Sequence, residues 1–133
     1  MKSTSLQNTI NHMGLPMIVT SSKPNLCFLI DTGATHNIVF SYVYEELKDL
    51  FQPLSLSSTM MGIDGVPQDT QQVTCTIAFE GREVCSSFSV LEAHIAVEQV
   101  QREHGVQIHG ILGVPFLTQN KWVLDFKNLT LYC

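Results

Sequence analysis

One stretch constrains the fold more than any other, a short apolar run that ends abruptly at an acid. Residues Cys27–Ile30 are all apolar, which is typical of a buried strand, and Asp31, Thr32 and Gly33 follow at once. A carboxylate at the end of a buried strand costs desolvation energy unless something compensates for it. Gly33 lets the backbone turn sharply there. The pattern therefore predicts a buried strand that delivers Asp31 to a tight polar turn.

Two interpretations of this turn compete. In the first, Asp31 only accepts hydrogen bonds from neighbouring amides, as Asp often does in turns. The tripeptide Asp-Thr-Gly carries little weight alone, because chance places it in roughly 3% of chains of this length. The apolar residues Ile38–Phe40 that follow, together with a second element far downstream, favour the other interpretation, a functional carboxylate.

Length and composition bound the remaining possibilities. The chain has 133 residues, which suits one domain, and its 14% charged and 44% apolar residues exclude a disordered or fibrous protein. A net charge of −5 with scattered acids argues against nucleic acid or an anionic membrane as partner. No apolar run approaches a membrane span, and residues 1–13 lack the apolar core of a secretory signal. We therefore expect a cytoplasmic protein.

Four cysteines are present, Cys27, Cys75, Cys85 and Cys133, and their wide spacing fits neither a metal knuckle nor a redox pair. We expect reduced thiols that act as small apolar groups. Cys75 and Cys85 flank a predicted hairpin at residues 80–81. A two-residue turn would place them on opposite faces, whereas a three-residue turn would oppose them, so this pairing stays open.

The order of predicted elements indicates a mainly β protein. Residues 1–14 are predicted to be a loose N-terminal arm and residues 15–133 a single domain. Helical patterns cover residues 41–51, with Ser41 as the N-cap, 93–104, ended by Gly105, and 116–120. Extended patterns cover 15–20, 26–30, 54–63, 71–79, 82–91, 106–112, 122–126 and 129–132, with hairpins between the first pair, the pair around residues 80–81 and the last pair.

The downstream element spans residues 108–117, where two large apolar residues precede Gly113 and a turn into a short helix. Together with the motif of residues 31–34 and a glycine-containing turn at 60–67, it resembles the retropepsin-like aspartic proteases. These are the retroviral and retrotransposon proteases and their cellular and bacterial relatives. The resemblance covers residues 15–132. It implies an acid protease fold, a single-lobed β-barrel or sandwich with a flap hairpin and two or three short helices.

The resemblance also implies roles for individual residues. Asp31 would be the catalytic carboxylate, Thr32 would hydrogen-bond across a dimer, and Gly33 would offer its amide to the carboxylate. The flap at residues 60–67 would close over an extended peptide, whose backbone pairs with strand edges. Gly113 would pack under the active loop. The residues that would contact substrate are Ala34, Met61, Gly62, Ile63, Asp64, Gly65, Val66, Ile111 and Gly113.

Such chemistry needs two aspartates facing one water, one ionised and one protonated. The chain holds a single Asp-Thr-Gly, since Asp64-Gly65 lacks the hydroxyl residue and Asp125 lies in a strand-turn context that favours a structural role. The second aspartate must therefore come from another copy, so we expect a symmetric homodimer with Asp31 on its two-fold axis. No cofactor is expected. The irregular spacing of His94, His104 and His109 indicates surface side chains rather than a metal site.

Two further expectations concern activity. Ala34 stands where pepsins have a hydroxyl that donates to the aspartate, and the loss of that hydrogen bond favours a mildly acidic to neutral pH optimum. The predicted function is an aspartic endopeptidase that hydrolyses extended polypeptides. The alternative is a non-catalytic module of the same fold that binds peptides or dimerises without cutting.

Overall fold

The computed structural model describes residues 2–61 and 65–133, and within them the protein is mainly β. The helices are α1 (Gln7–Met13), α2 (Ser41–Glu46), α3 (His94–His104) and α4 (Val114–Gln119), with a 3-10 turn at Lys48–Leu50. The strands are β1 (Ser3–Ser5), β2 (Met17–Val19), β3 (Cys27–Ile30), β4 (Ile38–Phe40), β5 (Phe51–Met61), β6 (Pro67–Phe79), β7 (Arg82–Leu91), β8 (Gly110–Leu112), β9 (Val123–Asp125) and β10 (Thr130–Tyr132). None of the described helices is both long and apolar enough to span a membrane.

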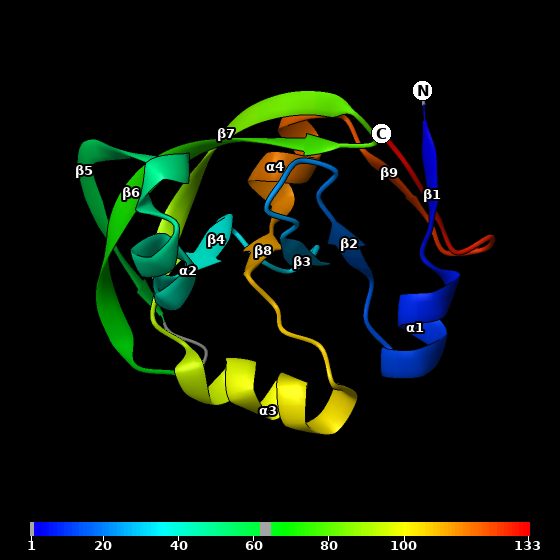
Figure 1. Cartoon of the computed structure of the whole chain (residues 1–133), viewed down its shortest axis with the longest axis horizontal. Helices are drawn as coiled ribbons and strands as arrows, with labels where there is room; N and C mark the ends of the chain where they lie inside the picture. The colour runs from blue at the N-terminus through cyan, green and yellow to red at the C-terminus, as the bar shows by residue number, and fades with distance from the viewer. Residues whose placement is uncertain (1, 62–64) are drawn as a thin grey trace.

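Two sheets organise the chain. The larger has the strand order β2-β3-β8-β4-β7-β6-β5, and the smaller has the order β1-β10-β9. The long strands β6 and β7 arch over the top of the molecule, and α3 runs along its lower edge (Figure 1). Since β2 and β5 remain as edges, the larger sheet does not close on itself within the described residues. Of the two arrangements expected, a barrel or a sandwich, the closed barrel is therefore excluded.

The centre of the larger sheet brings two distant segments together. β3 pairs with β8 in parallel, with Ile30 opposite Leu112, and β4 pairs with β8 antiparallel, with Ile38 opposite Ile111. Gly110 makes this close packing possible, because a Cβ there would overlap the carbonyl oxygen of Ile38. The register places the residues that follow β3 and β8 at the same end of the sheet.

An aromatic cluster fills the core beneath these strands. Phe28, Phe79 and Phe116 are almost fully buried. The Trp122 ring meets Phe79 and Phe116 edge to face, with centroids 5.0 Å and 4.9 Å apart, a favourable geometry for aromatic pairs. This contact anchors the chain between α4 and β9 to the larger sheet.

The first fourteen residues differ from the loose arm that the sequence predicts. β1 pairs with β10, so both ends of the chain lie together, with reciprocal backbone hydrogen bonds of 2.8 Å between Lys2 and Cys133 (Figure 1). Leu6 is only 1% exposed, and α1 follows it. The polar composition of this segment gives no sign of a strand. β1 is held by backbone hydrogen bonds to β10, and Leu6 is the one buried leucine beside it.

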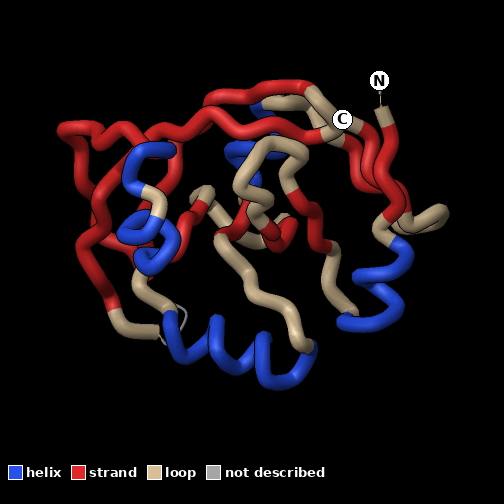
Figure 2. The backbone as a smooth tube through the Cα atoms, in the orientation of Figure 1, coloured by secondary structure: helices blue, strands red, loops and turns tan. Residues whose placement is uncertain are grey.

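The helices differ in extent and number from those expected: α2 is much shorter, while α4 begins two residues earlier and ends one residue earlier than expected. α1 raises the described α-helices to four, and α1 and α3 lie at the outside of the molecule (Figure 2). The helix predicted over residues 41–51 ends at Glu46, and β5 begins at Phe51, ahead of Pro53. Ser41 is the first helical residue, and Phe40, not Ser41, occupies the N-cap position. Gly105 ends α3 with a left-handed φ of 71°, as the sequence predicts.

The turn between β6 and β7 answers the question about Cys75 and Cys85. Phe79 pairs with Arg82, so the turn has two residues, and both adopt positive φ (51° at Glu80, 78° at Gly81). Cys75 is buried and Cys85 is exposed on the opposite face, so both are free thiols.

Candidate active site

Asp31 follows β3 directly and sits in a tight turn. Its backbone N–H donates to the carbonyl of Leu112 at 3.0 Å, which extends the pairing with β8 by one residue. The Gly33 N–H donates to Asp31 Oδ1 at 2.8 Å, and the Ala34 N–H donates to the Asp31 carbonyl at 3.2 Å. The Gly33 N–H thus donates to the Asp31 carboxylate, which is the contact that the resemblance implies.

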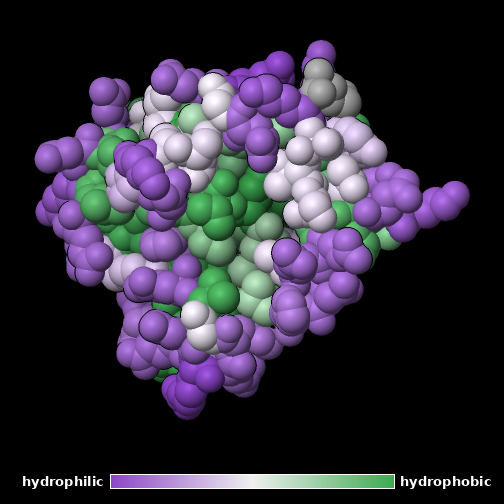
Figure 3. All heavy atoms as spheres, turned by 45° about the vertical axis from the view of Figure 1, so that its right-hand side comes forward, coloured by the Kyte–Doolittle hydropathy of each residue, from purple (hydrophilic) through white to green (hydrophobic). Residues whose placement is uncertain are grey.

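The half-buried Asp31 borders a hollow of about 310 Å³. Asp31 and Thr32 provide its polar lining, and the remaining lining residues are apolar: Leu15, Pro16, Leu29, Ile30, Leu124 and Phe126. Figure 3 shows an apolar recess at the centre of the face that includes β1 and α1, with hydrophilic atoms around it. Phe126 is exposed although it is large and apolar. A carboxylate therefore stands beside an open apolar surface.

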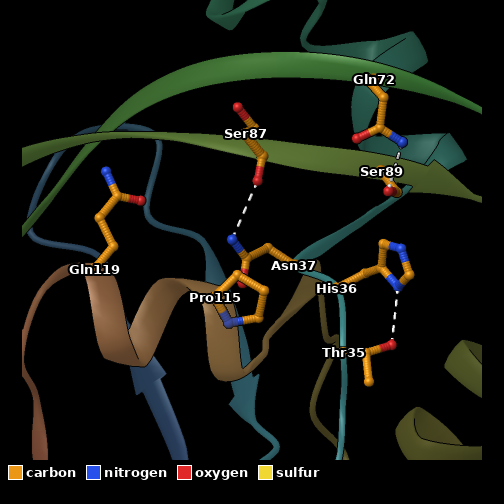
Figure 4. A pocket seen from close by; sticks show the side chains of 8 residues that line it. All are labelled: Thr35, His36, Asn37, Gln72, Ser87, Ser89, Pro115 and Gln119. Atoms are coloured by element: carbon orange, nitrogen blue, oxygen red, sulfur yellow. Dashed lines mark hydrogen bonds between the residues drawn. The ribbon is translucent and has the colours of Figure 1, made fainter. Parts of the chain in front are cut away.

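Asn37 braces the turn, and sequence reasoning did not assign it this role. It is 6% exposed, and its Oδ1 accepts the backbone N–H groups of Gly113 at 3.1 Å and Phe116 at 3.0 Å. Its Nδ2 donates to the carbonyl of Ser87 at 3.2 Å, as Figure 4 shows. One amide therefore holds the acidic loop, the start of α4 and β7. The only signal in the sequence was a polar residue directly before an apolar strand.

Gly113 packs directly beneath the loop that follows Asp31. A Cβ at this position would lie 2.5 Å from the carbonyl oxygen of His36 and 2.8 Å from that of Ala34. The Val114 N–H donates to the same Ala34 carbonyl at 2.9 Å. No side chain fits between the two segments, so only glycine allows them to approach this closely.

The other predicted site residues of this region occupy different environments. Thr32 is exposed, and its hydroxyl makes no hydrogen bond within the described part of the chain. Ala34 is half-buried. Ile111 is 7% exposed, lies in β8 between β3 and β4, and does not line the hollow.

The predicted flap corresponds to the outer part of the β5–β6 hairpin. Met61 pairs with Pro67 at its end. Met61 is 64% exposed and Val66 is 58% exposed, while Gly65 has a φ of 83°. The predicted contacts Gly62, Ile63 and Asp64 lie outside the described residues. Exposed apolar side chains on a projecting hairpin are suited to contact another molecule.

Asp125 occupies a structural turn, as the sequence predicts. Its carboxylate accepts a hydrogen bond from Asn128 Nδ2 at 2.8 Å and backbone N–H bonds from Asn128 and Lys127. These hydrogen bonds, first of all that from the Asn128 side chain, hold the pKa of Asp125 below its usual value. Asp125 therefore stabilises the turn between β9 and β10.

The histidines do not converge. His94 Nδ1 lies 2.6 Å from Glu92 Oε1, and His104 lies beside Glu103. His109 is half-buried rather than on the surface, which corrects the expectation, and its Nδ1 accepts the Cys27 N–H at 2.8 Å. Within residues 2–61 and 65–133, no group of three His, Cys, Asp or Glu side chains could hold a metal ion.

A second hollow of about 240 Å³ is lined by Asn37 and by other residues that are all polar except Pro115. It is lined by Thr35, His36, Asn37, Gln72, Ser87, Ser89, Pro115 and Gln119 (Figure 4). His36 Nδ1 and Thr35 Oγ1 lie 3.0 Å apart on its rim. None of the residues that line this hollow is an acid, and the hydroxyl of Thr35 beside His36 is the one pairing of a hydroxyl with a histidine ring among them.

No protein-family model matches the chain, and no curated protein matches it either. The chemistry of the site therefore has to be argued from its residues. Asp31 is the one acid that lines the apolar hollow. A lone carboxylate can accept a proton from water but cannot also supply one while it is ionised. A single acid at this hollow could supply only one of the two groups that acid–base chemistry requires.

Proposed function

We propose that the chain is an aspartic endopeptidase of the retropepsin-like fold, active as a homodimer in which two Asp31 carboxyls share one water. The observation that carries the proposal is the placement of Asp31. Asp31 follows a buried strand, its carboxylate accepts the Gly33 N–H at 2.8 Å, and it borders an apolar hollow. A carboxylate that served only its own turn would have no need of this open apolar surface.

The turn is built to stay in place during a reaction. Asn37 and Gly113 lock the following segment to α4 and β8, so Asp31 cannot move without disrupting buried hydrogen bonds. Positions held this rigidly are what catalysis requires of a reacting group. Thr32, exposed and without an intrachain partner among the described residues, is free to bond to a second copy.

The proposed mechanism balances its protons between the two carboxyls. The ionised Asp31 takes a proton from the water as its oxygen attacks the scissile carbonyl, and the protonated Asp31 of the second copy donates to the carbonyl oxygen. Collapse of the resulting diol breaks the C–N bond. One carboxyl then gives its proton to the leaving nitrogen, and the other recovers a proton from the diol. The pair finishes with one shared proton, as it began.

The test is cleavage of a denatured protein mixture between pH 4 and 7 by the wild type, Asp31→Asn and Asp31→Ala. We expect the wild type to cleave best at mildly acidic to neutral pH and both variants to lose roughly 10³-fold or more in rate. Asp49→Asn is the matched control, because Asp49 is exposed and does not line the hollow. Equal cleavage by the wild type and both Asp31 variants would refute the mechanism. A rate maximum below about pH 3, found by extending the range, would contradict the predicted pH optimum.

A further inference from the structure

We propose that Gln68 is a positioning residue of this site, because it fastens the β5–β6 ribbon to the segment that enters α3. The inference rests on the proposed function, in which that ribbon covers the peptide. Its geometry, however, involves only contacts within one chain and can be tested without turnover.

The outer part of the ribbon lacks support from the sheet. β6 pairs with β7 only from Gln72, opposite Ser89, to Phe79. Beyond Gln72, residues 67–71 pair with residues 57–61 of β5 alone. A two-stranded ribbon is at best marginally stable by itself. Its position must therefore depend on side-chain contacts.

The root of the ribbon is held by the Gln72 carboxamide. Its Nε2 lies 2.7 Å from Ser89 Oγ on β7 (Figure 4). The same nitrogen lies 3.0 Å from Ser58 Oγ and 3.4 Å from Thr70 Oγ1. Thr70 and Ser89 are each 1% exposed. This cluster fixes where the ribbon leaves the sheet, but it does not constrain the part farther out.

Gln68 supplies the second attachment, four residues farther out along β6. Its Oε1 accepts the backbone N–H of Glu92 at 3.1 Å, and its Nε2 donates to the carbonyl of the same residue at 3.4 Å. The carboxamide thus pairs with both the N–H and the carbonyl of Glu92, as the backbone of a neighbouring strand would. A bidentate contact of this kind restrains direction as well as distance.

The restraint continues into α3. The Glu92 carboxylate accepts the backbone N–H of His94, the first residue of α3, at 2.9 Å, and its Oε1 also lies 2.6 Å from His94 Nδ1. Ile95 is the next residue of α3, and its apolar side chain is 71% exposed. The exposed apolar side chains of the ribbon, Met61 and Val66, therefore belong to a unit that is tied to α3 before any peptide binds. Such pre-organisation lowers the entropy cost of binding.

The kinetic test compares Gln68→Ala with Gln71→Ala. Gln71 lies on the same strand with an exposed side chain, so the control makes the same chemical change without touching Glu92. We expect Gln68→Ala to raise KM about 5- to 10-fold with kcat changed less than about 2-fold, because the ribbon must then be ordered by the substrate. Gln71→Ala should keep both constants. A KM for Gln68→Ala equal to that of the control would overturn the proposal.

A second variant gives a pH signature that a merely structural role would not produce. In Gln68→Glu, the protonated carboxyl can donate and accept as the amide does, whereas the ionised form loses the donor and places a charge near the Glu92 carboxylate. We expect the ratio of the variant's KM to that of the wild type to fall towards one as the pH is lowered through the range where a glutamate protonates, about 4 to 5. A ratio independent of pH contradicts the bidentate contact.

Hydrogen exchange of the free protein separates this inference from the protease proposal. Gln68→Ala should accelerate exchange of the amides in residues 57–61 and 68–71 at least about 5-fold, and leave those of β7 unchanged. If the wild type cleaves nothing while exchange responds in this way, the protease proposal fails and the attachment stands. If cleavage is normal and exchange is unaffected, the attachment fails and the protease proposal stands. Faster exchange with an unchanged KM would overturn the positioning role.

Discussion

The side-chain oxygen of Asn37 accepts the backbone N–H of Gly113 at 3.1 Å and so joins two segments that are 76 residues apart in the sequence. Asn37 stands on the loop after Asp31, and Gly113 stands on the turn after β8. Their junction holds Asp31 at the edge of the apolar hollow, and the first two predictions address it.

Asn37→Ala should lower the free energy of unfolding by about 3 kcal/mol, because it leaves the buried N–H groups of Gly113 and Phe116 without an acceptor. Urea unfolding measures the loss. Asn8→Ala, at an exposed position of α1, should change stability by less than about 0.5 kcal/mol. A loss for Asn37→Ala as small as that of the control would show that the junction is not a major contact.

Gly113→Ala should destabilise the fold by about 1–3 kcal/mol, since its Cβ would press on the carbonyl oxygens of His36 and Ala34, which are backbone atoms and cannot rotate away. Denaturant midpoints report the change. The control is Gly105→Asn, at the left-handed end of α3 where nothing lies within 4 Å and Asn is tolerated. Wild-type stability of Gly113→Ala would mean that the two segments are less tightly packed.

Stability should depend on pH through His109. Burial lowers the pKa of His109, while the backbone of Cys27 and the charge of Glu46 act in the opposite sense. The Nδ1 atom of His109 accepts the Cys27 N–H only while that nitrogen is unprotonated. A histidine whose pKa is lowered by folding stabilises the protein fully above its unfolded pKa of about 6.5 and loses that contribution as the pH falls through the folded value. His109→Gln should therefore flatten the fall in unfolding free energy between pH 7.5 and pH 5. Identical slopes in both proteins would rule out this assignment.

Thiol reactivity should distinguish the two cysteines of the β6–β7 hairpin. Burial raises the pKa of Cys75 to about 11, so only about 0.1% of it is thiolate at pH 8, whereas Cys85 is exposed. A disulfide reagent should label one thiol rapidly in the native protein. Cys85→Ser should abolish the rapid phase and Cys75→Ser should retain it. An intact mass that reveals a Cys75–Cys85 disulfide would contradict the two-residue turn.

Activity should depend on protein concentration, because one copy supplies one Asp31 to the proposed pair. On dilution below the dimer dissociation constant, activity per unit of protein should fall in proportion to concentration, and sedimentation should show dimer dissociation over the same range. Asp31→Asn subunits mixed in excess with wild-type subunits should suppress activity by forming mixed dimers. Constant specific activity in a demonstrably monomeric sample would show that a single chain suffices.

Much of the fold could be predicted because its signals are local. The alternation of β-branched residues around residues 80–81 and the apolar run before Asp31 each specify a strand within a few residues, and Gly105 ends α3 by its own conformational freedom. The missed elements lack such signals. β1 is polar and short, and it exists because the opposite end of the chain provides β10 as its partner.

The sequence by itself determined that a strand carries Asp31 into a glycine turn and that a hairpin and a glycine-ended apolar strand lie downstream, because each depends on neighbouring residues. Only the tertiary structure decided that Asn37 is the brace, that His109 is half-buried and that Gln68 meets Glu92. Those roles come from partners 24 to 82 residues away, whose proximity is set by strand order and register. The chemistry of a side chain is a property of that residue alone, but its hydrogen-bond partner and its burial depend on how the whole chain packs.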